Sequence, residues 1–157
     1  MKRINFEELL QTELRWPTLG DAPFVMATNP RDNANIPEDE FTRLVFMMEG
    51  YKKAADLMIR QATANPMERE YLVCPVIFNY RQFLELSLKY LISTYGRTVK
   101  IGAIWKSHDL AQLWQTFREM LRRYGTADPD SADPIVEEII AEFAKIDPGS
   151  YSYRYPV

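Results

Sequence analysis

Residues 71–93, YLVCPVIFNYRQFLELSLKYLIS, decide the fold that the rest of the sequence predicts. Placed on a helix, the apolar side chains of this stretch cover roughly 260° of the circumference, far more than the apolar stripe of an ordinary surface helix. The one polar gap holds Arg81, Glu85 and Lys89, whose i, i+4, i+8 spacing puts them on a single line. A helix that is apolar on nearly all sides predicts a central position in a helical bundle.

The composition is that of a globular protein of one domain. The chain has 157 residues, of which 46% are hydrophobic and 26% charged, and its formal net charge is −3. One cysteine, Cys74, and one histidine, His108, exclude a disulfide framework and a Cys/His zinc site within a single chain. We expect Cys74 to be an inert core thiol, because its neighbours in the sequence are apolar.

The sequence shows no signal for export, for a membrane or for a cofactor. The start, MKRINFEELL, carries charges and no apolar signal-peptide core, and no apolar run approaches the roughly 20 residues that span a bilayer. There is no phosphate-binding glycine loop and no nucleophile elbow. The acids Asp128, Asp130 and Asp133 lack the glycine and the terminal glutamate of an EF-hand. We therefore expect a cytoplasmic protein with no metal and no cofactor.

Around the central stretch, apolar spacing predicts further helices whose ends are marked by proline and glycine. Pro75 is expected to kink the central helix or to mark its true start, and a short strand over residues 71–74 is the alternative. The loop that follows the central helix, residues 97–106, has apolar anchors that include Trp105. We predict a short helix over Asn5–Arg15, an irregular arm to residue 36, and long helices from near Pro37 to about Thr63, from a Ser107 cap to Gly125, and from Asp133 to Ile146.

Together these elements predict an all-α fold, a bundle of four main helices plus a short N-terminal helix. We divide the chain into the N-terminal helix and arm (residues 1–36), the bundle (residues 37–147) and an aromatic tail (residues 148–157). The tail, which ends in YSYRYPV, is expected to dock on the bundle, because closely spaced aromatic side chains bury well.

Charge is unevenly distributed along the second half of the chain. Residues 97–123 carry six basic and two acidic side chains, a net charge of +4, whereas residues 128–147 carry seven acids and one lysine, a net charge of −6. Three interpretations stay open: two solvated helix surfaces, a face that attracts a phosphate-bearing partner, or a dimer interface.

His108 is the only side chain whose unperturbed pKa lies near neutral pH. It lies off the apolar stripe of its helix, and Glu85 is the expected hydrogen-bond partner of its imidazole. The histidine then either fixes the loop to the bundle or acts as an acid, a base or a ligand group. The row of Arg81, Glu85 and Lys89 is either a set of surface pairs or, on a mostly buried helix, a paired, interfacial or functional row.

Two segments, RQFLELSLKYLI (residues 81–92) and SHDLAQLW (residues 107–114), resemble the HEPN superfamily (higher eukaryotes and prokaryotes nucleotide-binding domains) over roughly residues 37–147. HEPN domains are helical bundles in which a Glu-x-x-x-Lys pair, here Glu85 and Lys89, precedes a Ser/Gly-His-Asp-Leu helix start. The resemblance implies a homodimer that binds RNA, a nucleotide or a protein partner, often in bacterial defence or toxin–antitoxin systems. Many HEPN members are metal-independent endoribonucleases with an arginine shortly before a histidine near the last helix.

The chain departs from that ribonuclease pattern, because its one histidine is His108 and none follows Arg154. Our leading hypothesis is a dimeric HEPN-like module that binds its partner without catalysis. One alternative is a divergent metal-independent endoribonuclease, with His108 as the catalytic acid or base and either Arg154 or Arg81 on the phosphate. Another is a structural or adaptor protein whose aromatic tail is the contact surface. The ligand-binding residues of the leading hypothesis are Arg81, Glu85, Lys89 and Asp109.

Overall fold

The computed structural model describes residues 18–20, 28–29, 31, 33–126, 131–151 and 153. The chain divides after Ile36 into residues 1–36 and residues 37–157. In the first unit, the side-chain oxygen of Asn29 accepts a hydrogen bond from the backbone N–H of Arg31. The short helix predicted over residues 5–15 lies outside the described residues.

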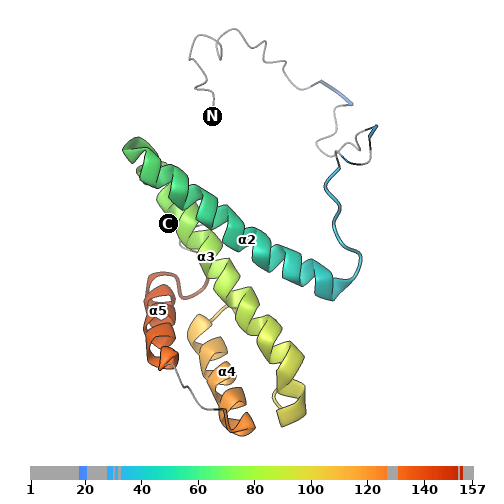
Figure 1. The fold of residues 1–157 in the computed structure, drawn as a ribbon, viewed down its shortest axis with the longest axis vertical. Helices are drawn as coiled ribbons and strands as arrows, with labels where there is room; N and C mark the ends of the chain where they lie inside the picture. Colours follow the sequence, from blue (N-terminus) through green and yellow to red (C-terminus); the bar gives the residue numbers. More distant parts are fainter. Residues whose placement is uncertain are drawn as a thin grey trace. The chain divides into compact units, whose positions relative to one another are not determined.

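Helices build the second unit, so the predicted all-α bundle of four main helices is confirmed (Figure 1). Where the structure describes the chain, it contains no β-strand. The elements are α2 (Glu40–Ala64), α3 (Pro66–Tyr95), the 3-10 helix η2 (Gly96–Val99), α4 (Leu110–Tyr124) and α5 (Ala132–Ile146).

Polar side chains cap the two long helices. The carboxylate of Asp39 accepts a hydrogen bond from the N–H of Thr42 at 2.7 Å, which lowers the pKa of Asp39 and caps α2. The start predicted near Pro37 is therefore slightly early. Asn65 ends α2 and caps α3 with its side-chain oxygen, and Pro66 follows in the first turn, where a missing N–H breaks no helical hydrogen bond.

Pro75 lies inside α3, which runs without interruption from Pro66 to Tyr95. The strand alternative for residues 71–74 is wrong, because these residues are helical. The helix starts well before the central stretch because Asn65 and Pro66 together form a strong start signal. The central stretch, residues 71–93, thus lies entirely within α3 and makes up most of it.

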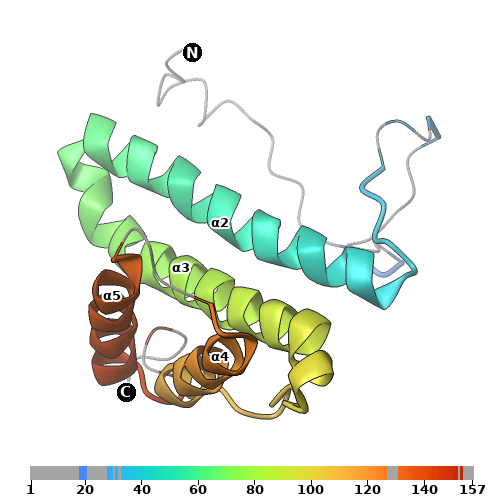
Figure 2. The ribbon, with the colours of Figure 1, turned by 60° about the horizontal axis from the view of Figure 1, so that its bottom comes forward.

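The second half of α3 lies between α2 on one side and α4 and α5 on the other (Figure 2). This position gives the fold one apolar core, in which side chains of α3, α4 and α5 meet. The most deeply buried members of the core are Leu88, Ile92, Leu110, Leu113, Trp114 and Ile140.

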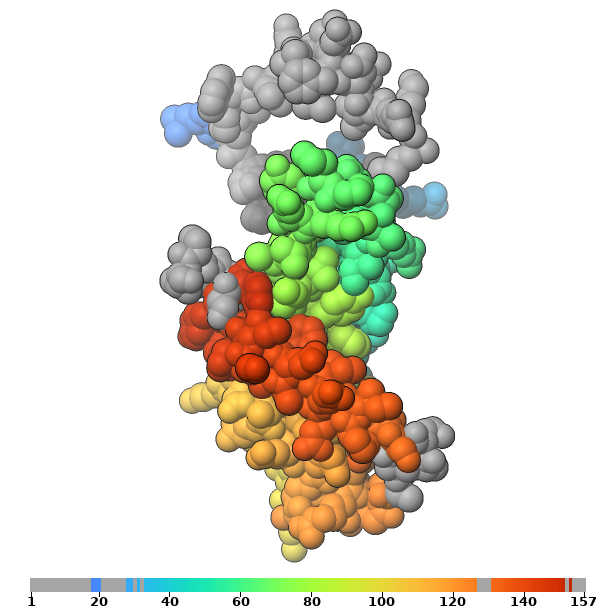
Figure 3. Space-filling model, turned by 90° about the vertical axis from the view of Figure 1, so that its left-hand side faces the viewer, coloured from blue at the N-terminus to red at the C-terminus, as the bar shows by residue number. Residues whose placement is uncertain are grey.

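The first part of α3 is less covered than the apolar pattern predicts. Tyr71 is 74% exposed and Val73 is 48% exposed. The expectation that Cys74 is a core thiol is wrong, because this cysteine is exposed. The helices α4 and α5 have 15 residues each and pack against each other, so together they cover only part of the 30-residue α3. Figure 3 shows the end of the α2–α3 hairpin where the two helices join, drawn in green, beyond α5 and α4.

Candidate functional site

The polar row on α3 is buried. Arg81, Glu85 and Lys89 are 0%, 2% and 3% exposed. The polar gap of the helical wheel therefore faces the inside of the protein and not the solvent. Because an unpaired charge in a protein interior costs several kcal/mol, these three side chains require partners within the fold.

All three nitrogen atoms of the Arg81 guanidinium group donate hydrogen bonds inside the protein. Its Nη1 donates to Oε2 of Glu85 at 2.9 Å, and its Nη2 donates to the carbonyl oxygen of His108 at 2.6 Å. Its Nε donates to the carbonyl oxygen of Asp147 at 3.1 Å and lies 3.3 Å from the carboxylate of that residue. One side chain therefore joins α3 to the residues that precede α4 and to the residue that follows α5.

The carboxylate of Glu85 is the centre of the network. Its Oε1 accepts from Nζ of Lys89 at 2.7 Å and contacts Nδ1 of His108 at 2.9 Å, while Oε2 accepts from Arg81. Burial by itself raises the pKa of Glu85, but hydrogen bonds from Lys89, Arg81 and His108 outweigh burial and lower it below its ordinary value. Glu85 is therefore ionised at neutral pH and can only accept hydrogen bonds.

His108 reaches from the surface to this buried carboxylate, as the sequence predicts. Because Glu85 only accepts, Nδ1 of His108 must carry a proton, and a neutral imidazole then has its lone pair on Nε2. The side chain of His108 is 50% exposed, whereas that of Glu85 is 3% exposed. An imidazole held in this way can take up a proton at Nε2 or, once protonated, donate a hydrogen bond to an anion.

The same network fixes the loop between η2 and α4. Nζ of Lys89 donates to the carbonyl oxygen of Trp105 at 2.9 Å, and Arg81 holds the carbonyl oxygen of His108. Two buried cations on α3 thus form hydrogen bonds with the backbone at both ends of residues 105–108. On the outside of this loop, Trp105 is 49% exposed, His108 is half exposed and Lys106 is exposed.

Asp109, and not Ser107, caps α4. The carboxylate of Asp109 accepts from the N–H of Gln112 at 3.0 Å. The hydroxyl of Ser107 accepts from the N–H of Asp109 and donates to the side chain of Gln112. The cap predicted at Ser107 is therefore wrong, because the serine supports the cap and the helix begins later. The ligand-binding role of Asp109 stays a prediction, and it would compete with capping.

The residues after α5 close the network against α3. Asp147 and Ser150 are each 1% exposed. Asp147 accepts from the N–H of Tyr151 at 2.8 Å, and the side-chain amide of Gln82 donates to the hydroxyl of Ser150 at 2.8 Å. The first residues of the tail are thus docked, although Tyr151 is 62% exposed. Arg154, the second predicted catalytic residue, lies outside the described residues.

Pairing within the chain neutralises much of the basic charge on α4. Nη1 of Arg118 lies 2.8 Å from Glu137, and its Nε lies 3.3 Å from Asp133, so this arginine ties α4 to α5. Both acids line the groove of about 490 Å³ between these helices. The acidic segment therefore serves in part as the internal partner of the basic one.

The remaining arginines of α4 pair within their own helix. Nε of Arg122 and Nε of Arg123 each lie 2.8 Å from the carboxylate of Glu119, whose pKa the two hydrogen bonds lower, that from Arg123 more strongly. The other three basic residues of the segment 97–123 are exposed and form no ion pair with any described residue. They are Arg97, Lys100 and Lys106.

A pocket of about 700 Å³ lies where α2, the end of α3 and the loop meet. Phe41, Met47 and Trp105 line it and are 51%, 47% and 49% exposed. Sequence reasoning missed this pocket, because it treated Trp105 only as an apolar anchor of the loop. The available signal was the position of Trp105 between Lys100 and Lys106, in a loop that ends at the only histidine.

Within the described ranges, no three His, Cys, Asp or Glu side chains gather so that they could hold a metal ion. None of the helices in the described part of the chain combines the length and the apolarity needed to cross a membrane. No protein-family model matches the chain, and searches of curated proteins and of solved structures found no match either.

Proposed function

We propose that the chain is a HEPN-like cytoplasmic helical module that works as a homodimer and binds single-stranded RNA or a nucleotide without catalysis. One observation carries the proposal: buried Lys89 and Arg81 hold the carbonyl oxygens of Trp105 and His108. As a result, a fixed loop of four residues presents an aromatic ring, an ammonium group and an imidazole. The resemblance to HEPN domains adds the setting, a bacterial defence or toxin–antitoxin system.

Each group on this loop suits one part of a nucleotide. The half-exposed indole of Trp105 offers a face on which a base stacks, a contact that does not depend on sequence. The ammonium of Lys106 suits a phosphate, and His108 can donate to a phosphate oxygen from Nε2 when protonated. The pocket beside Trp105, with Phe41 and Met47 in its wall, offers further apolar surface for a base.

The same geometry supports binding without cleavage. Metal-free cleavage of RNA by a histidine–arginine pair would use an imidazole to move a proton and a cation to stabilise the phosphate. Arg81 is the arginine nearest to His108 in the network, but it is 0% exposed and holds Glu85 and two carbonyl oxygens. Its guanidinium would have to leave all three partners to reach a substrate.

Binding of a fluorescent single-stranded RNA, measured by anisotropy over a range of salt concentrations, tests the proposal. We expect affinity to fall as salt rises. Trp105→Ala should weaken binding by about 1–3 kcal/mol and leave the salt slope unchanged, because it removes stacking. Lys106→Ala should reduce the slope of log K against log salt by about 0.7, because it removes one phosphate contact.

Lys145→Ala is the matched control, since Lys145 is an exposed lysine near the end of α5, far along the chain from the loop. It should change neither the affinity nor the slope. A mononucleotide that displaces the labelled RNA from the protein would show that the site also binds free nucleotides. Absence of binding at low salt, or binding that Trp105→Ala and Lys145→Ala alter equally, would reject the proposal.

A divergent metal-independent endoribonuclease is the second candidate, favoured by the hydrogen bond between His108 and Glu85. That contact fixes the tautomer in which Nε2 can act as a general base. Incubation of the chain with mixed RNA in EDTA tests it. Cleavage that is lost in His108→Ala would establish this function. Cleavage that persists in His108→Ala would point to a contaminant, and no cleavage would leave the binding module.

A further inference from the structure

Gly50 has no explanation within the described fold. It lies inside α2, a helix of 25 residues, where glycine is the worst helix former after proline. A methyl group added at this position would meet no atom of the described residues within 4 Å, and the backbone there is not in the left-handed region. Among the described residues, neither packing nor conformation therefore calls for glycine, and close approach of another backbone is the remaining use of a missing side chain.

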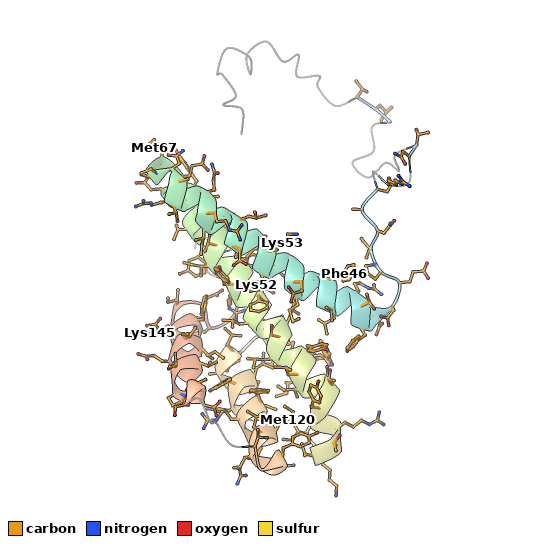
Figure 4. The ribbon with its side chains drawn as sticks, viewed as in Figure 1. Phe46, Lys52, Lys53, Met67, Met120 and Lys145 are labelled. Carbon is orange, nitrogen blue, oxygen red and sulfur yellow. The ribbon has the colours of Figure 1, made fainter. Side chains whose placement is uncertain are left out.

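The surface around Gly50 is an exposed face of α2 directed away from α3. At about 100° per residue, Phe46, Gly50, Lys53 and Leu57 fall within about 60° of arc, opposite the fully buried Ala55. Phe46 is 59% exposed and Leu57 is 55% exposed. Figure 4 shows Phe46 and Lys53 on the side of α2 that faces away from α3.

The order of residues on this face is that of a self-complementary surface. A two-fold axis between Tyr51 and Lys52 places Phe46 opposite the partner's Leu57 and Lys53 opposite the partner's Gly50. An antiparallel copy of α2 would thus match apolar groups at both ends, and the long stem of each lysine would cross the partner's glycine.

The charges on this face also favour a second copy of the chain as its partner. Glu49 is exposed and Lys53 is exposed, and neither forms an ion pair with any described residue, although their i, i+4 spacing would allow one between them. In the antiparallel arrangement, each Lys53 lies within one residue of the partner's Glu49. The two opposite charges at the centre of the face therefore meet across the axis, twice per dimer.

We propose that this face of α2, defined by Phe46, Glu49, Gly50, Lys53 and Leu57, binds a second copy of the chain in an antiparallel two-fold arrangement. The inference rests on the homodimer of the proposed function and adds the surface that forms it. Because a single helix face gives an interface at the small end of the usual range, the dimer should be weak and should dissociate on dilution.

Sedimentation equilibrium of the full chain over a wide concentration range tests the surface. The wild-type chain should be a monomer–dimer mixture, and Leu57→Glu should raise the dimer Kd at least about tenfold by burying a carboxylate against an apolar group. Gly50→Leu should raise the Kd similarly while circular dichroism shows unchanged helix content. Lys145→Glu, a charge reversal on α5, is the matched control and should leave the Kd unchanged.

Charge exchange separates self-association from binding of another protein. Lys53→Glu and Glu49→Lys should each weaken the homodimer, because like charges then face each other across the axis. Mixed together, the two variants should form a heterodimer, and the double variant should recover the wild-type Kd. No other partner would reproduce this pattern of loss and recovery.

The outcomes distinguish this inference from the proposed function. A wild-type chain that stays monomeric at the highest soluble concentration overturns the inference, and so does a dimer that these substitutions leave unchanged. The RNA-binding proposal survives either result if salt-dependent binding at Trp105 and Lys106 is found. Conversely, a dimer that responds as expected in a chain that does not bind RNA supports the surface and rejects the function.

Discussion

The two long helices differ in what they bury. On α3, the charged row of Arg81, Glu85 and Lys89 is almost completely buried, whereas on α2, Phe46 and Leu57 are more than half exposed. From polarity alone, the charged side chains would be expected at the surface and the apolar side chains in the interior. The difference lies in the neighbouring helices: α3 is covered by helices on two sides, whereas among the described helices α2 packs against α3 alone.

The comparison teaches that a buried charge and an exposed apolar side chain need different explanations. The row on α3 is stable because acceptors meet each cation, from the same helix and from backbone far away in the chain. Among the described residues, Phe46 and Leu57 on α2 stay more than half exposed, so their apolar area is available to another surface. Four predictions test this contrast.

The largest effect is expected from Glu85→Gln. This change keeps the shape of the side chain but leaves Arg81 and Lys89 as buried cations without a carboxylate. We expect the free energy of unfolding to fall by about 3–5 kcal/mol, measured by urea denaturation. Glu142→Gln, an exposed acid on α5, should change it by no more than about 0.5 kcal/mol. Equal effects of the two substitutions would mean that the network does not stabilise the fold.

A matched pair of leucines gives the apolar side of the comparison. Leu113 is 0% exposed in the core, and Leu57 is 55% exposed on α2. Leu113→Ala should cost about 2–5 kcal/mol of unfolding free energy, because it leaves a cavity. Leu57→Ala should cost less than about 0.5 kcal/mol in a solution dilute enough to dissociate the proposed dimer. A large loss at Leu57 in the monomer would show that the face of α2 is covered within one chain.

Acidification should remove the contribution of Glu85. Its pKa is lowered in the folded protein, so its stabilising effect is complete above the unfolded value, ordinarily 4.5, and is lost as pH falls through the lower folded pKa. Each pKa unit between the two states corresponds to about 1.4 kcal/mol. The stability difference between the wild-type chain and Glu85→Gln should thus be constant near neutrality and shrink in acid. A difference that stays constant into strong acid would show that the charge of Glu85 is not what stabilises the fold.

The smallest effect is expected where α2 and α3 share a hydrogen bond. The hydroxyl of Tyr80 donates to Asp56 at 2.7 Å, which raises the pKa of Tyr80. Tyr80→Phe should lower the free energy of unfolding by about 1 kcal/mol. Tyr71→Phe, at a side chain that is 74% exposed, should have almost no effect. A clear loss at Tyr71 would mean that the first part of α3 is covered in solution.

Local information in the sequence predicted the helices and much of the site. Apolar spacing and the caps of each helix act over a few residues, so the order of the four long helices and the pairing of Glu85 with Arg81 and Lys89 followed from the chain itself. The contact between Glu85 and His108 was also predicted, because the imidazole had one suitable carboxylate on the central helix.

Tertiary structure alone decided which way these groups face. A helical wheel gives the angle of each side chain about the helix's own axis. Where the neighbouring helices lie around that axis is decided by contacts between residues far apart in the sequence. The carbonyl of Asp147, which holds Arg81, lies 66 residues further along the chain. For this reason the sequence determined that a charged row exists on α3, and only the packing of α4, α5 and the loop decided that the row is buried and that Trp105, Lys106 and His108 are presented at the surface.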